Sequence, residues 1–201
     1  VDAYYFQIVT LSLVLVYCRL GRSISSCDDS SIRKLCSTNA IPCYEKLFAM
    51  LELWLLPINL NVLTGDEEYM KEILLHDLSD AEYMLCIGYM NLNDFDKAIH
   101  YIEQSIIHAK QLEEGETKIQ KAFDLMSWQS EICTQMEKYV EVKAVMEEAY
   151  ICVSEIYHPE HPRVLKVGGE LIEILGNTGD HYDTERFARI CYDSLICPPL
   201  D

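Results

Sequence analysis

Apolar residues recur at helical spacing on both sides of a short polar break in the segment 79–111. The break is Asn91-Leu92-Asn93-Asp94, and the apolar positions beside it repeat every three or four residues. This pattern predicts two amphipathic helices, neither of which can bury its apolar face alone. Ser79, followed by Glu82 three residues later, predicts a capping box at the start of the first helix. The apolar positions are Met84, Leu85, Tyr89 and Leu92 in the first helix and Phe95, Ala98, Ile99, Ile102 and Ile106 in the second.

The helix–turn–helix pattern returns twice toward the C-terminus. Glu137-Lys138-Tyr139 stands 44 residues after Asn93-Asp94-Phe95, and Gly179-Asp180-His181 follows 42 residues later. Apolar spacing predicts helices over residues 122–136 and 139–157, on either side of the second of these turns. Further apolar positions predict a helix before the third turn and another after it. They are Leu171, Ile172, Ile174 and Leu175 before it, and Phe187, Ala188, Cys191 and Leu195 after it.

This part of the chain resembles the tetratricopeptide repeat. Leu85, Tyr89 and Ala98 stand at the leucine, tyrosine and small-residue positions of that repeat, and Asn93-Asp94-Phe95 stands at its inter-helix turn. The long intervals, with His161-Pro162 between units, are similar to the repeats of kinesin light chain and its relatives. The departures from the pattern are Glu82 for tryptophan, Cys86 for glycine, Ile102 for an aromatic residue and Lys110 for proline.

The resemblance implies an all-α fold, a right-handed α-solenoid of antiparallel helix pairs. It implies degenerate helical repeats over residues 1–78 and three tetratricopeptide-like repeats over residues 79–201, at 79–112, 120–157 and 163–196. Such repeats are interaction scaffolds, so the implied function is the non-catalytic binding of a partner peptide or helix in the concave face of the array.

The N-terminal 78 residues follow the repeat only weakly. Their pattern predicts a short helix near residues 32–36, a helix over 42–56 that begins at Pro42, and a helix over 66–78. Pro57 is expected to end or kink the second of these helices, because proline removes a backbone donor and clashes with the preceding turn.

The most apolar stretch runs from Tyr4 to Leu20, and its 17 residues reach the lower limit for a membrane span. Leu13 and Tyr17 in this stretch, with Gly21 directly after it, repeat the spacing of the central repeat, which favours a buried helix of a degenerate repeat. The alternative function is therefore a membrane-anchored or self-assembling structural piece that uses this apolar segment. The apolar residues near 170–195 cover more than one helix face, so we expect either further repeats beyond Asp201 or self-association at the C-terminal end.

The chain carries a formal net charge of -17 and has a pI near 4.6. Phosphate backbones would be repelled, so nucleic acid is an unsuitable partner, and charged protein partners are expected to be basic. The nine cysteines form no C-x2-C pair and are odd in number, which predicts reduced thiols in the cytoplasm.

No motif for catalysis or cofactor binding occurs in the sequence. It contains no Walker, dinucleotide-binding, nucleophile-elbow or zincin pattern, so we expect no enzyme activity and no cofactor. His158 and His161 could supply two metal ligands, but no third ligand stands at a suitable spacing, and a structural loop without metal is favoured. Gly168-Gly169 is interpreted as a closely packed helix interior, and Trp54 and Trp128 as core residues.

The candidate site is the face that the first helix of each repeat would present to a bound peptide. Asn91, Gln135 and Asn177 stand two residues before successive turns, and their amides could hydrogen-bond an extended peptide backbone. Helix capping is the alternative interpretation for the asparagines. The basic residues of a groove for chaperone C-termini are not repeated at matching positions of the first helices, where Asp80, Asp124 and Lys166 stand. The predicted partner-binding residues are Tyr83, Asn91, Glu131, Gln135, Glu173 and Asn177.

Overall fold

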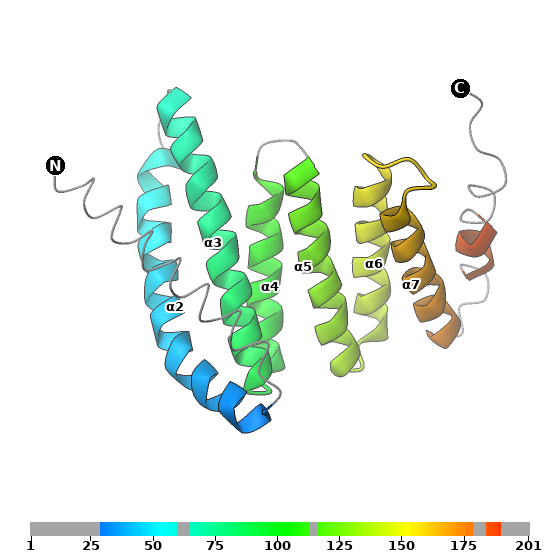
Figure 1. Cartoon of the computed structure of the whole chain (residues 1–201), viewed down its shortest axis with the longest axis horizontal. Coiled ribbons are helices and arrows are strands. Elements are labelled where there is room, and N and C mark those ends of the chain that lie inside the picture. The colour runs from blue at the N-terminus through cyan, green and yellow to red at the C-terminus, as the bar shows by residue number, and fades with distance from the viewer. Residues whose placement is uncertain (1–28, 60–64, 113–115, 179–183, 190–201) are drawn as a thin grey trace. The chain divides into compact units, whose positions relative to one another are not determined.

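The computed structural model of the chain describes residues 29–59, 65–112, 116–178 and 184–189 (Figure 1). All regular structure in these residues is helical, with no strand, so the predicted all-α fold is confirmed. The chain divides between Glu113 and Glu114 into two compact units. Residues 78 and 79, between which the sequence analysis divides the chain, both lie in α3 (Gly65–Asn91).

The described residues of the first unit form the helices α2 (Ser30–Asn59), α3 (Gly65–Asn91) and α4 (Phe95–Lys110). Helix α3 packs against both α2 and α4. Its apolar residues therefore cover more than one side of the helix, as expected for a helix between two neighbours. The buried apolar residues are Ile41, Tyr44, Leu47, Leu51 and Leu55 on α2, Leu74, Leu75, Leu78, Ala81, Met84, Leu85, Cys86 and Tyr89 on α3, and Ala98, Ile102, Ile106 and Ala109 on α4.

Helix α2 begins earlier and runs longer than the sequence pattern predicts. Asp29 caps it, because Oδ1 of Asp29 accepts hydrogen bonds from the backbone N–H and the hydroxyl of Ser31 at 2.8 and 2.6 Å. These hydrogen bonds lower the pKa of Asp29. The helix then continues through Pro42 and Pro57, so the predicted start at Pro42 is wrong. Figure 1 shows α2 bending in its N-terminal, blue part, as an internal proline requires.

Helix α3 corrects a second prediction. It is continuous from Gly65 to Asn91 and merges the two helices expected over 66–78 and from 79 onward. Ser79 and Glu82 therefore lie in the middle of a helix, where no free N–H groups need capping, and the predicted capping box is wrong. Both side chains are fully buried and are used for contacts with α4.

The turn after α3 occurs again after α5 (Glu116–Gln135) with the same geometry. Asn93 and Glu137 have φ values of 60° and 58°, in the left-handed region. The next backbone amide, of Asp94 or Lys138, donates to the carbonyl five residues earlier, at 2.9 Å in both turns. This is the Schellman arrangement, which satisfies the last carbonyls of each helix. The break at residues 91–94 and its counterpart 44 residues later are confirmed as turns.

The second unit contains α5, α6 (Tyr139–Ser154), α7 (Pro162–Thr178) and a helical stretch at 184–189. Helix α6 packs against both α5 and α7. Phe187 is buried and meets Tyr150 edge-on, with 5.5 Å between ring centroids. The other buried apolar residues are Ala122, Phe123, Leu125, Met126, Ile132 and Cys133 on α5, Val142, Val145, Met146, Ala149 and Val153 on α6, and Val164, Val167, Leu171 and Leu175 on α7.

Two glycines test the interpretation of close helix packing. A Cβ added at Gly169 would meet nothing within 4 Å, so close packing is not the reason for this glycine. A Cβ at Gly88 on α3 would lie 2.9 Å from Cγ1 of Ile41 on α2. The close approach of two helices therefore occurs at Gly88, where only a glycine leaves room for the isoleucine.

None of the described helices is long and apolar enough to cross a membrane. The apolar stretch from Tyr4 to Leu20, the turn at Gly179 and most of the last predicted helix lie outside the described residues. Among the described residues of 170–189, Leu171 and Leu175 are buried, and Ile172 and Ile174 are half-buried.

Candidate functional site

The exposed side of α5 carries the best-defined group of polar and aromatic side chains in the second unit. Asp124, Trp128, Glu131 and Gln135 follow one another at steps of three and four residues, which places them on one side of the helix. All four are exposed, while residues on the opposite side of α5, such as Met126 and Cys133, are buried. Trp128 is 37% exposed, so its interpretation as a core residue is wrong.

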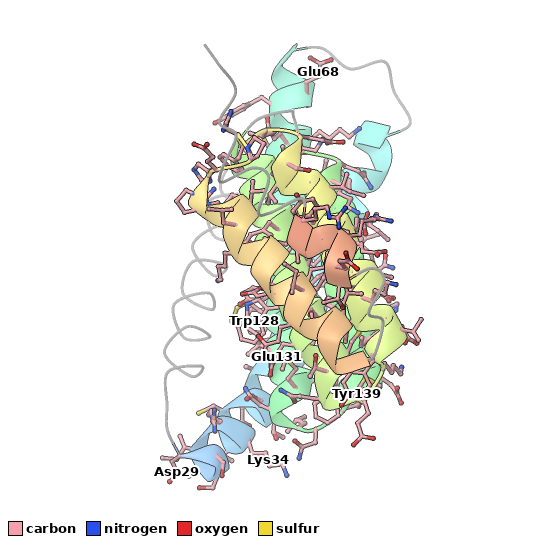
Figure 2. The ribbon with its side chains drawn as sticks, turned by 90° about the vertical axis from the view of Figure 1, so that its right-hand side faces the viewer. Asp29, Lys34, Glu68, Trp128, Glu131 and Tyr139 are labelled. Atoms are coloured by element: carbon pink, nitrogen blue, oxygen red, sulfur yellow. The ribbon has the colours of Figure 1, made fainter. Side chains whose placement is uncertain are left out.

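Two amides hold the carboxylates of this side of α5. Nε2 of Gln120 donates to Oδ1 of Asp124 at 2.7 Å, and Nε2 of Gln135 donates to Oε1 of Glu131 at 3.0 Å. Each pair is four residues apart, as such helix-surface hydrogen bonds require. The predicted residues Glu131 and Gln135 therefore lie together. Figure 2 shows Trp128 and Glu131 one above the other on the same side of the helix.

The predicted site residues on α3 are placed differently. Asn91 is half-buried, and its Nδ2 donates to Oγ of Ser37 on α2 at 3.1 Å. The amide of Asn91 thus links two helices of the first unit instead of standing open to a peptide. Tyr83 is half-buried. On α7, Glu173 is exposed, whereas the side chain of Asn177 lies outside the described residues. Of the six predicted residues, the structure brings Glu131 and Gln135 into direct contact.

A buried polar cluster between α3 and α4 escaped the sequence analysis. Glu82 is fully buried, and its Oε2 lies 2.8 Å from Nδ1 of His108. One turn away, the hydroxyl of Ser79 donates to the carbonyl of Ser105 at 3.0 Å, and the hydroxyl of Ser105 donates to the carbonyl of Ser79 at 2.7 Å. Oε1 of Glu82 has no hydrogen-bond partner among the described residues. The cluster is closed to solvent at Glu82, so it joins two helices and is not an open site.

Burial raises the pKa of Glu82, and the hydrogen bond from His108 offsets part of that effect. The nearby Glu52 raises this pKa further, and His100 lowers it. A raised pKa means that the folded chain holds the Glu82 proton more tightly than the unfolded chain does. The stabilisation from this carboxyl is therefore complete below its ordinary value near pH 4.3 and is lost as the pH rises through the raised value.

We expect the loss of stability that Glu82 causes with rising pH to disappear in the Glu82→Gln variant, because glutamine does not titrate. Urea unfolding at intervals from pH 4 to pH 8 would measure it. The difference in unfolding free energy, wild type minus variant, should decrease with rising pH by at most about 1.4 kcal/mol per pH unit. A difference that rises with pH would show that the carboxylate form is the one favoured by folding.

A second cluster of side chains, centred on Tyr89, joins the helices of the first unit. The hydroxyl of Tyr89 donates to Oε1 of Glu45 at 2.7 Å, and its ring stacks on Tyr101 with centroids 5.6 Å apart. Nζ of Lys97 lies 4.7 Å from the centroid of the same ring. Burial, together with the Glu45 carboxylate, raises the pKa of Tyr89, so the phenol stays a donor. These contacts join α2, α3 and α4, and they give Tyr89 a structural role.

The described residues offer no group of three side chains suited to a metal ion. His161 stacks on Tyr157 with 4.2 Å between centroids, and its Nδ1 accepts the backbone N–H of Arg163 at 3.3 Å. The cysteines at 36, 43, 86, 133 and 152 are not in disulfide bonds. Burial raises the pKa of Cys86 to about 12, which keeps this thiol protonated and unreactive.

Comparisons with known proteins do not identify this site, so we interpret it from its chemistry. No family model matches the sequence, and no curated protein matches it either. The exposed side of α5 combines an indole, two carboxylates and an amide. The opposite side of this helix is buried. Such an arrangement can bind an extended chain or a helix through hydrogen bonds, ring contacts and charge.

Proposed function

We propose that this chain is a non-catalytic interaction scaffold, a right-handed tetratricopeptide-like array of antiparallel helix pairs that binds a partner peptide or helix on the exposed side of its first helices. The observation that carries the proposal is the repeated turn. Asn93 and Glu137, 44 residues apart, have the same left-handed conformation and the same hydrogen bonds. Two consecutive units built on one pattern are the basis of a stacked helical array.

The exposed side of α5 supports the location of the binding face. Glu131 and Gln135 are exposed and bonded to each other, so their free polar atoms are held in a fixed direction. Fixed polar groups lose little side-chain entropy when a partner binds. The free cysteines support the cytoplasm as the place of action, since thiols stay reduced there.

Binding of the full chain to an array of short peptides of varied composition tests this function. A subset of the peptides should bind, and the double variant Glu131→Ala, Gln135→Ala should lose binding to them. The matched control changes Glu141 and Glu155, which are exposed at the two ends of α6, to alanine and should leave binding unchanged. If no peptide binds, or if both double variants bind as the wild type does, the proposed function is wrong.

A further inference from the structure

Helix α2 exposes apolar side chains on the side opposite its buried residues. Leu35 and Leu53 are 64% and 68% exposed. They are 18 residues apart, or about five helical turns, so they lie on the same side of α2. Tyr44 is nine residues from each leucine, about two and a half turns, and therefore lies on the opposite side, where it is 2% exposed. Helix α2 thus has one buried apolar side and one exposed apolar side.

The neighbouring helices indicate what the exposed side of α2 is suited to. Helix α3 is apolar on more than one side because it packs against both α2 and α4. Helix α2 has a similar distribution of apolar residues, yet it is the outermost described helix of the first unit, with α3 on one side of it (Figure 1). The exposed residues at helical spacing on its other side, called here the outer side of α2, are Leu35, Pro42, Ala49 and Leu53. This composition is typical of a surface that another helix covers.

The apolar stretch from Tyr4 to Leu20, which lies outside the described residues, precedes α2 directly in the sequence. As a helix, its 17 residues would extend about 25 Å, and the distance along α2 from Leu35 to Leu53 is about 27 Å. The eight residues 21–28, which include a glycine and three serines, connect the stretch to the start of α2. They can span up to about 26 Å, more than the ~10 Å between the axes of packed helices. These lengths allow the stretch to reverse direction and lie antiparallel along the outer side of α2.

Tethering and charge favour this stretch over a separate molecule. A segment joined to its docking surface through eight residues has an effective concentration on the order of millimolar. A second copy of the chain would carry the same formal net charge of -17, and two such molecules repel each other. The stretch itself contains one charged residue, the basic Arg19. It can therefore approach an acidic protein without repulsion.

We propose that the stretch from Tyr4 to Leu20 docks along the outer side of α2, antiparallel to this helix. Its apolar side chains cover Leu35 and Leu53 and remove them from water, which is the driving force of the docking. The stretch is then held against the protein and is not available to a lipid bilayer. This inference concerns a surface of the first unit, and its test is independent of the proposed binding face on α5.

Photo-cross-linking of the full chain tests the position of the stretch. The variant Leu53→benzoylphenylalanine places a photoreactive group on the outer side of α2. The control variant Val140→benzoylphenylalanine places the same group on α6, where Val140 is 81% exposed. After irradiation and digestion, mass spectrometry should find residues 4–20 linked to position 53 of the same chain and not to position 140. Links between two copies of the chain at position 53, or no link from position 53 to residues 4–20, would overturn the inference.

Binding to lipid vesicles tests the consequence of the docking. The full chain is mixed with phosphatidylcholine vesicles, and the bound fraction is separated by centrifugation. The wild type should stay in solution. The double variant Leu35→Ser, Leu53→Ser should raise the bound fraction about tenfold or more, because the burial of a single leucine already changes an equilibrium by that factor. The control Val140→Ser, Ile151→Ser removes two exposed apolar side chains from α6 and should leave the bound fraction unchanged.

Either of two results with vesicles would contradict the inference. If the wild type binds the vesicles as strongly as the variant of Leu35 and Leu53, the stretch is not held by α2 and acts as a membrane anchor. If neither protein binds, the two leucines do not control the availability of the stretch. Circular dichroism of each variant verifies that the helices are intact.

Discussion

Substituting His108 with alanine is expected to lower the free energy of unfolding by about 3–5 kcal/mol. Glu82 is 0% exposed, and the ring of His108 is its one hydrogen-bond partner among the described residues. Alanine would leave both carboxylate oxygens in the α3–α4 interface without a donor. A buried acid must then either keep its charge unpaired or take up a proton at neutral pH, and both options destabilise the folded state. Urea unfolding at pH 7 measures the loss.

The control for His108→Ala is a double variant based on the equivalent positions of the second unit. The positions 44 residues after Glu82 and His108 are Met126, which is fully buried, and Cys152. The double variant Glu82→Met, His108→Cys therefore copies an apolar arrangement that the fold already uses. It should be as stable as the wild type or up to about 4 kcal/mol more stable, because an apolar pair avoids the desolvation of two polar groups. If the double variant lost as much stability as His108→Ala, the effect would come from packing around the ring and not from the buried carboxyl.

The comparison of Ser79 and Glu82 with Asp94 shows which structural features a local sequence pattern can predict. Asp94 is the last residue of the polar break, and it caps α4, with Oδ1 accepting the N–H of Lys97 at 3.3 Å. Ser79 and Glu82 have the spacing of a capping box, yet their partners Ser105 and His108 stand 26 residues further along the chain. A pattern of four residues contains no information on a partner at that distance.

The same limit applies to prolines and to the candidate site. Pro42 fits a helix start, but the hydrogen bonds at Asp29 begin α2 before it, and packing of α2 on α3 holds the helix together beyond the proline. On α5, Glu131 and Gln135 have helical spacing, and they lie on one exposed side of the helix. The spacing did not separate Trp128 from the core, because the buried residues Leu125 and Ile132, three before and four after it, lie on the adjoining side of the helix.

Substituting Ala98 with leucine is expected to lower the free energy of unfolding by about 1–3 kcal/mol. Ala98 lies near the start of α4, is 0% exposed and belongs to the buried side of this helix, which packs against α3. The tetratricopeptide resemblance places its small residue here, where two helices cross closely. Leucine adds three carbon atoms to a position that is already full, so the helices must separate or the new side chain must leave its preferred rotamers. Urea unfolding of the full chain at neutral pH measures the change.

Ala144→Leu on α6 is the matched control, because it makes the same exchange at an exposed position inside a helix. Alanine and leucine are both strong helix formers, so this variant should change the unfolding free energy by less than about 0.5 kcal/mol. A loss at Ala98 with none at Ala144 locates the effect in the α3–α4 interface. If Ala98→Leu were as stable as the wild type, the interface would have room for a larger side chain. The position of Ala98 in the repeat would then be assigned wrongly.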